Sequence, residues 1–96
     1  MTLEDLYLII NDRKEKMVKN SYVSTLFRKG IDSIRRKVGE EAVELIIAAK
    51  GKRKKRIIAE TADLLFHLLV LLAYFKISPD QILAELDRRN RNNSRI

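Results

Sequence analysis

Apolar side chains near the start of the chain recur every three or four residues, which places them on one face of an α-helix. These positions are Leu3, Leu6, Tyr7 and Ile10. Thr2 stands just before them and is a preferred N-cap residue. We therefore expect a first helix that begins at this residue and fades around residues 19–21.

The next segment, residues 21–27, is rich in hydroxyl side chains. Such side chains bond to nearby backbone groups and favour turns. We expect this segment to be a loop, followed by one short turn before Gly30. A loop of this kind can hold a ligand.

Two long helix-compatible segments follow, at residues 31–49 and 55–75. Gly51 and a basic stretch separate them, and a glycine commonly ends a helix. The two segments therefore predict a central helical hairpin.

The four residues from Ser78 to Gln81 predict the start of a last helix. Ser78 is a suitable N-cap, Pro79 fits the first helical position, and Gln81 completes a capping box. We expect this helix to reach about Arg89. Residues 90–96 have little to bury, so this tail is expected to fray or to lie across a partner.

No segment alternates clearly between apolar and polar side chains, and the chain has three glycines and one proline. We therefore predict an all-α fold, a four- to five-helix bundle formed by one domain over residues 1–96. The chain is 46% hydrophobic and 34% charged, as expected of a globular protein. Because so short a chain buries a modest fraction of its surface, we also expect a homodimer whose interface completes the core.

Composition excludes several classes of protein. The apolar run at residues 64–75 contains His67 and is shorter than the roughly 20 residues that span a bilayer, so we expect a buried helix and no membrane partner. Residues 1–5 lack the pattern of a secretory signal, which predicts a cytoplasmic protein. The absence of cysteine excludes disulfides and thiolate zinc sites. A net charge of +7 attracts polyanions, which include nucleic acid, acidic lipid and polyphosphorylated small molecules.

Two groups of acidic residues lie on the predicted central helices, and each group shares a helical face at about 100° per residue. Their neighbours are apolar, so we expect these helices to be mostly buried. Converging carboxylates then repel one another, on the order of several kcal/mol, unless a cation lies among them. Oxygen ligands suit Mg²⁺ or Mn²⁺, and Mg²⁺ commonly bridges carboxylates to substrate phosphates. The acids are Glu40, Glu41 and Glu44 on the first helix, and Glu60 and Asp63 on the second.

Ordinary salt bridges are the alternative explanation of these acids. Acidic and basic residues three or four positions apart on a helix surface commonly pair. The available cations are Lys37, Lys50, Lys55 and Arg56. Spacing alone leaves both explanations open.

The paired motifs Glu-Glu-x-x-Glu and Glu-x-x-Asp resemble those of the all-α nucleotide pyrophosphohydrolases of the MazG type. Within that superfamily, nearly the whole chain resembles the phosphoribosyl-ATP pyrophosphohydrolase family of histidine biosynthesis. The matching stretches are Ser21-Tyr22, Lys29-Gly30, the run Lys-Val-Gly-Glu-Glu-Ala-Val-Glu at 37–44, Ala48-Ala49-Lys50, and residues 60–72, which begin Glu-Thr-Ala-Asp-Leu-Leu-Phe-His.

This resemblance implies hydrolysis of phosphoribosyl-ATP to phosphoribosyl-AMP and pyrophosphate, with Mg²⁺ as cofactor and a homodimer as the assembly. Glu40 is implied to be a further ligand or the group that orients water, so that Glu40 and Glu41 are the candidate catalytic residues. The implied metal ligands are Glu41, Glu44, Glu60 and Asp63.

Four residues are candidates for substrate contacts. Lys37 precedes the first acidic motif by one turn and can neutralise a phosphate oxygen, and Lys29 can reach another phosphate. Ser21 and Tyr22 match the family's loop and can contact substrate through a hydroxyl or the ring. For His67 we favour a structural role, or one in orienting a carboxylate.

Two rival functions remain open from the sequence. A related pyrophosphohydrolase could act on another nucleoside triphosphate. A basic helical module could bind nucleic acid through residues 50–56, where six of seven side chains are cationic. That stretch lacks aromatic residues and any recognised nucleic-acid motif, so we expect a solvated loop and no nucleic-acid partner. Arginines near the end of the last helix are weaker phosphate-binding candidates: Arg88, Arg89 and Arg91.

Overall fold

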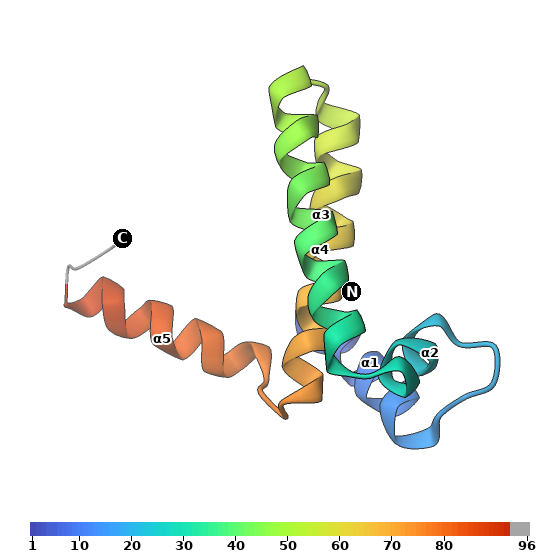
Figure 1. Cartoon of the computed structure of the whole chain (residues 1–96). Helices are drawn as coiled ribbons and strands as arrows, with labels where there is room; N and C mark the ends of the chain where they lie inside the picture. Colours follow the sequence, from blue (N-terminus) through green and yellow to red (C-terminus); the bar gives the residue numbers. More distant parts are fainter. Residues whose placement is uncertain (93–96) are drawn as a thin grey trace.

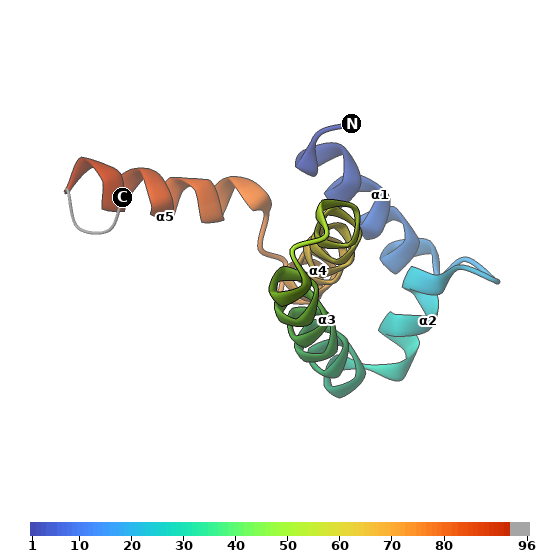
Figure 2. The ribbon, with the colours of Figure 1, turned by 90° about the horizontal axis from the view of Figure 1, so that it is seen from above.

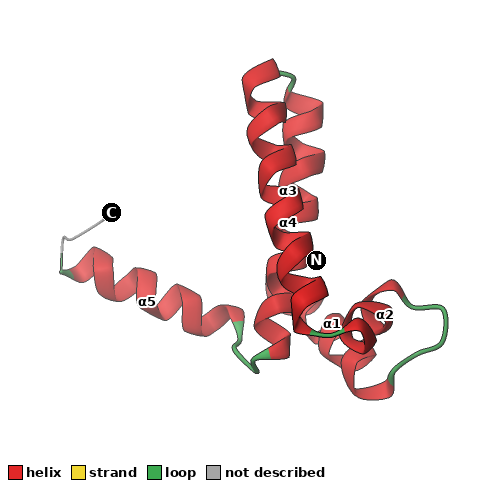
Figure 3. Cartoon of the chain, in the orientation of Figure 1, coloured by secondary structure: helices red, strands yellow, loops and turns green. Residues whose placement is uncertain are grey.

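The computed structural model describes residues 1–92, and all regular structure in that range is helical. The predicted all-α fold is therefore confirmed (Figures 1 and 3). The helices are α1 (Leu3–Lys16), α2 (Tyr22–Lys29), α3 (Ile31–Gly51), α4 (Lys54–Tyr74) and α5 (Pro79–Arg91).

The long helices α3 and α4 form an antiparallel hairpin that projects from the rest of the molecule (Figure 1). Helices α1 and α2 pack at the base of this hairpin, and α5 extends from the opposite side (Figure 2). The radius of gyration is 14.9 Å, whereas a compact domain of this length has about 12.5 Å. The chain is thus more extended than a single closed bundle.

The hydrophobic core lies at the base, where α1 and α2 meet the first turns of α3 and the end of α4. Ser24 is fully buried within this base, and its hydroxyl donates a hydrogen bond of 2.8 Å to the Arg13 carbonyl. This bond satisfies the hydroxyl of a side chain that is shielded from water. The core side chains are Tyr7, Ile10, Val23, Leu26, Ile34, Leu69, Val70 and Ala73.

The upper part of the hairpin is not covered within the chain. The expectation that both central helices are mostly buried is wrong for this chain, since in α3 only Ile34 and Ala48 are buried. Helices α1 and α2 are too short to reach along the hairpin. Large apolar side chains therefore face outward, and Ile46 and Ile58 are 68% and 70% exposed.

The segment predicted as a hydroxyl-rich loop is instead the two-turn helix α2, and α1 ends earlier than expected, at Lys16. Ser21 caps α2, because its Oγ accepts a hydrogen bond of 3.2 Å from the Ser24 amide. Val23 and Leu26 lie one turn apart and bury against the core. Capping and burial thus outweigh the turn tendency of the hydroxyls.

Both helix starts predicted from capping residues are confirmed. Thr2 and Asp5 form a reciprocal capping box on α1. At α5, Pro79 occupies the first turn, and the Ser78 amide donates to the Gln81 side chain at 2.9 Å. Helix α5 runs to Arg91 and is capped by Asn92, so the expected tail is helical at residues 90–91. Residues 93–96 of that tail lie outside the described residues.

By length and composition alone, α4 is apolar enough to cross a membrane, with a mean hydropathy of 1.8 over its most apolar window. The core helix of a soluble protein passes the same test. In the structure, α4 packs against both α3 and α1. Within the chain 22% of that window is buried, and the buried residues of α4 lie toward its C-terminal end at the base of the molecule.

Candidate metal centre on the α3–α4 hairpin

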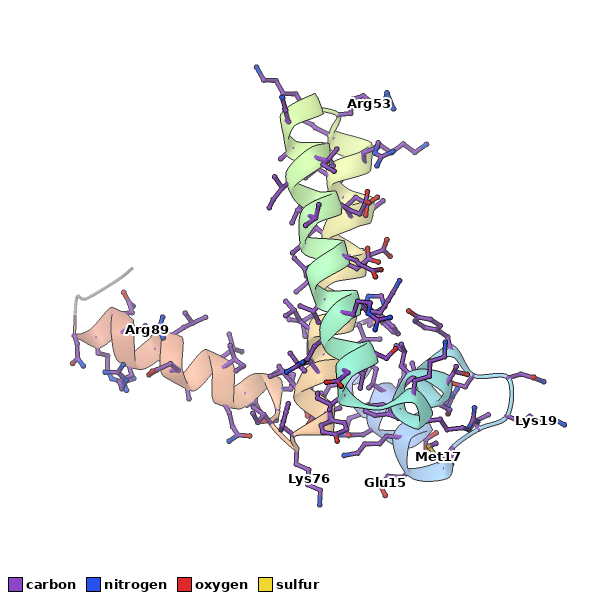
Figure 4. The ribbon with its side chains drawn as sticks, viewed as in Figure 1. Glu15, Met17, Lys19, Arg53, Lys76 and Arg89 are labelled. Atoms are coloured by element: carbon purple, nitrogen blue, oxygen red, sulfur yellow. The ribbon has the colours of Figure 1, made fainter. Side chains whose placement is uncertain are left out.

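Three of the five predicted acids converge between the two long helices. Carboxylate oxygens of Glu41 on α3 and of Glu60 and Asp63 on α4 lie within 4.8 Å of one another. Side-chain oxygens gather on one flank of the hairpin (Figure 4). The side chains of Glu41 and Glu60 are only 13% and 17% exposed, whereas Asp63 is open to solvent. The group is thus half-buried and open on one side.

The donor set of this cluster fits a hard divalent cation. Three carboxylates offer only oxygen, which Mg²⁺ and Mn²⁺ prefer. Two oxygens bound to one Mg²⁺ lie at most about 4.2 Å apart, given bonds of 2.0–2.1 Å. Small side-chain rotations therefore suffice to bring these three groups onto one ion, and the open side leaves room for water and a phosphate.

The other two predicted acids lie outside this group. Glu40 points toward solvent, with its side chain 52% exposed, and lies 3.6 Å from the Lys37 ammonium. Glu44 is exposed one turn beyond Glu41 on α3. The roles of Glu44 as a metal ligand and of Glu40 as a catalytic group stay predictions.

Lys37 partly neutralises the α3 side of the cluster. Its ammonium lies 3.6 Å from both Glu40 Oε2 and Glu41 Oε1. Burial lowers the pKa of Lys37, but the charges of Tyr22, Glu40 and Glu41 act against this, so the pKa lies above its ordinary value. Lys37 therefore stays cationic beside the acids, as a phosphate-binding lysine must.

A hydrogen-bonded chain connects α2 to the backbone of Asp63 in the acidic cluster. The Tyr22 hydroxyl lies 2.8 Å from Nε2 of His67, and Nδ1 of His67 lies 2.7 Å from the Asp63 carbonyl oxygen. A carbonyl oxygen can only accept, so Nδ1 carries a proton. In the neutral ring Nε2 then accepts from Tyr22. Both ring nitrogens are occupied, which agrees with the structural role favoured for His67.

Tyr22 also contacts a second aromatic ring of α4 and is influenced by the nearby acids. Its ring stacks on Phe66 at 6.2 Å between centroids and meets the His67 ring edge-on. Burial raises the pKa of the Tyr22 hydroxyl, the carboxylates of the acidic cluster raise it further, and the cation of Lys37 opposes them. The phenol is therefore held protonated, although half of the Tyr22 side chain is exposed. The sequence indicated Tyr22 as a loop residue but gave no sign of its contact with Phe66.

The remaining two predicted substrate contacts lie at the two ends of α2. Ser21 caps the helix through its Oγ, and its carbonyl accepts a hydrogen bond of 3.0 Å from Thr25. Lys29 is exposed in the last turn and forms no ion pair with the acids of residues 1–92. Neither contact with substrate is tested by this geometry, and both stay predictions.

Salt bridges account for only part of the acidic pattern. Arg56 lies 3.5 Å from Glu60, and Lys37 pairs as described, so two of the four candidate cations contact the acids. Lys50 and Lys55 are exposed without an ion pair to the acids of the described chain. Near the C-terminus, Arg88 bonds to Glu85 on its own helix at 2.6 Å.

Comparison with known proteins decides which family this chain belongs to. Residues 3–90 match the model of the family described as phosphoribosyl-ATP pyrophosphohydrolase. The chain belongs to the phosphoribosyl-ATP pyrophosphohydrolase family. The resemblance inferred from the acidic motifs is thereby confirmed, and with it the assignment of the chain to hydrolases of phosphoanhydride bonds.

Relatives from bacteria and archaea support this assignment over most of their length. The chain is 53% identical to the phosphoribosyl-ATP pyrophosphatase of Geobacter sulfurreducens over 87 residues, which cover 91% of this chain and 81% of the relative. It is 46% identical to the phosphoribosyl-ATP pyrophosphatase of Saccharolobus solfataricus over 89 residues, which cover 93% and 95% of the two chains. The likeness therefore includes the whole hairpin and its acids.

Proposed function

We propose that this chain hydrolyses phosphoribosyl-ATP to phosphoribosyl-AMP and pyrophosphate, a step of histidine biosynthesis, at a Mg²⁺ site formed by Glu41, Glu60 and Asp63. The convergence of these three carboxylates from two helices carries the proposal. Family membership supplies the substrate, because the relatives of this chain are named for it. We propose a soluble, cytoplasmic enzyme.

The reaction breaks the bond between the α-phosphorus and the oxygen that bridges to the β-phosphate. When bound, Mg²⁺ neutralises phosphate oxygens and lowers the pKa of a coordinated water. Glu44 lies one turn from Glu41 and is proposed as a fourth ligand. Glu40 is proposed to orient the attacking water and to accept its proton, since its carboxylate is exposed beside the cluster and is not fully neutralised by Lys37.

Residues around the cluster are proposed to bind the anionic substrate. Lys37 already lies between two acids and can move its ammonium to a phosphate once those acids bind metal. Tyr22 presents a half-exposed ring beside the cluster, suited to stacking on a base. Ser21 and Lys29, at the two ends of α2, are proposed as further contacts.

We propose that the working form is a homodimer. The upper hairpin exposes Ile46 and Ile58, and an apolar hollow of about 640 Å³ opens between α1, α4 and α5. Soluble monomers rarely leave apolar patches of this kind uncovered. The hollow is lined mainly by Leu3, Leu65, Leu68, Leu72, Leu83 and Leu86.

Pyrophosphate release from phosphoribosyl-ATP, with and without Mg²⁺, tests the proposed activity. We expect magnesium-dependent release that falls by about a hundredfold or more in Glu41→Gln and Asp63→Asn, because each change removes a ligand charge. Glu85→Gln on α5 removes an acid away from the site and serves as the control. Release from ATP or dUTP instead would support metal-dependent hydrolysis but show that phosphoribosyl-ATP is not the substrate. A folded protein that releases pyrophosphate from none of the three would reject the activity.

A further inference from the structure

One face of the hairpin changes from acidic near the middle of the arm to basic at its tip. One face of α4 carries Asp63, Glu60 and Arg56 at intervals of three and four residues. The row continues to Arg53, three positions earlier, which is the N-cap residue of the helix. Arg53 lies at the tip of the hairpin, where the chain turns from α3 into α4 (Figure 4). The basic loop is therefore continuous with the metal centre along α4.

A matching row runs along α3 with the same spacing. Its members are Glu41, Glu44, Ala48 and Gly51. They lie as many positions before Lys52 as Asp63, Glu60, Arg56 and Arg53, in that order, lie after it. In an antiparallel hairpin, such positions lie opposite one another. Two observations agree with this pairing. Glu41 meets the acids of α4 in the cluster, and Ala48 and Gly51 meet the two arginines in a hollow near the tip.

The hollow has a volume of about 240 Å³ and is lined by Ile47, Ala48, Gly51, Arg53 and Arg56. Small side chains on α3 leave this space open opposite the arginines, and a Cβ added to Gly51 would meet no atom within 4 Å. The other cations of the loop do not line it. Two guanidinium groups beside an open hollow suit phosphate oxygens, which arginine can bind with two parallel hydrogen bonds.

Arg56 also connects the hollow to the metal centre. Its guanidinium lies 3.5 Å from Glu60 Oε1, and its side chain is half exposed. A cation bound by Glu60 would compete for the same carboxylate and release the guanidinium toward the hollow. The rise along α4 between Arg56 and Glu60 is about 6 Å, a span that a polyphosphate chain covers.

We propose that Arg53 and Arg56, with Ala48 and Gly51 opposite them, form a phosphate-binding subsite beside the metal centre. The proposal rests on the proposed function for the identity of its ligand. Phosphoribosyl-ATP carries phosphate at two ends, the triphosphate and the phosphoribosyl phosphate, and both offer the same chemistry. The subsite holds one of these ends while the α-phosphate lies at the acids.

Calorimetric titration of the full chain with pyrophosphate and with ribose 5-phosphate, each in the presence of Mg²⁺, tests the subsite and separates the two ends. In Arg53→Gln/Arg56→Gln we expect affinity to fall by about tenfold or more for one probe and much less for the other. If affinity for pyrophosphate falls, the subsite binds the triphosphate end of the substrate. If affinity for ribose 5-phosphate falls, it binds the phosphoribosyl end. Unchanged affinity for both probes in a folded variant overturns the proposal.

A matched control separates a built subsite from the general field of the basic loop. Lys54→Gln/Lys55→Gln removes the same charge from neighbouring positions that do not line the hollow. An equal loss of affinity in this control overturns the proposal. Gly51→Leu keeps every charge and fills the hollow, so it should weaken binding of the same probe. These measurements record binding alone, so their result can be interpreted even if the protein does not hydrolyse phosphoribosyl-ATP.

Discussion

The Tyr22 hydroxyl lies 2.8 Å from Nε2 of His67, and this hydrogen bond links the short helix α2 to the helix that carries Glu60 and Asp63. His67 is 6% exposed and bonds through Nδ1 to the backbone of Asp63. The position of α2, with its proposed substrate contacts, is thus coupled to the backbone of a proposed metal ligand. Such outer hydrogen bonds commonly orient the groups that bind a metal.

Tyr22→Phe removes the hydroxyl and keeps the ring stacked on Phe66. We expect a loss of about 1 kcal/mol in the free energy of unfolding, because the Nε2 acceptor of a buried ring loses its partner. If the hydroxyl acts through His67, kcat for phosphoribosyl-ATP falls by about three- to tenfold with KM nearly unchanged. If the hydroxyl binds substrate directly, KM rises instead.

Nitrogen NMR checks this interpretation independently of activity. His67 is the single histidine of the chain, so its two ring nitrogens are observed without overlap. In Tyr22→Phe the Nε2 resonance should shift, because its hydrogen bond is lost, while the Nδ1 resonance keeps the signature of a protonated nitrogen. Tyr74→Phe, at the end of α4, is the matched control and should leave both unchanged. An unshifted Nε2 resonance in Tyr22→Phe would contradict the contact.

The raised pKa of Tyr22 predicts a specific alkaline titration. Burial first, and then the nearby carboxylates, keep its phenol protonated above the ordinary value of 10.0. The folded protein holds this proton more tightly than the unfolded chain does, so the stabilisation is complete below pH 10 and is lost as the pH rises through the raised pKa. Absorbance at 295 nm should show a late ionisation step for Tyr22, and Tyr22→Phe should remove that step.

Local sequence rules predicted most of the backbone correctly but not the docking of its elements. Thr2 and Pro79 mark helix starts because capping depends on neighbours within one turn. The acids of α4 share a face because helical periodicity also depends only on residues within one turn. The contact between Tyr22 and His67 joins residues far apart in the chain, so no local pattern indicates it. The exposure of Ile46 likewise depends on how far α1 and α2 reach, which helical periodicity does not encode.

Asp63→Asn should stabilise the protein in the absence of divalent ions. Its carboxylate lies within 4.8 Å of two others and forms no ion pair among the described residues. Removing one of these charges relieves about 1 kcal/mol of repulsion in a largely solvated setting, which raises the melting temperature by about 4–8 °C in EDTA. Functional residues commonly lower the stability of the folded protein in this way.

Adding Mg²⁺ should make wild type more stable than Asp63→Asn. Wild type gains stability because the ion binds the folded state, whereas Asp63→Asn gains little. Thermal unfolding in EDTA and in millimolar Mg²⁺, with Glu85→Gln as the control, measures both effects. If Asp63→Asn is instead less stable than wild type in EDTA, the carboxylate is held by stabilising contacts, as the salt-bridge explanation requires.

Ile46→Glu should convert the proposed dimer into a monomer. Ile46 is 68% exposed in the isolated chain, and a glutamate buried there in an interface would lose its hydration without a partner. Sedimentation equilibrium should give twice the chain mass of 11.2 kDa for wild type and the single mass for the variant. Met17→Glu adds the same charge at an exposed apolar residue of the base and should remain dimeric (Figure 4). A monomeric wild type that still releases pyrophosphate would show that the hairpin needs no second copy to complete the site.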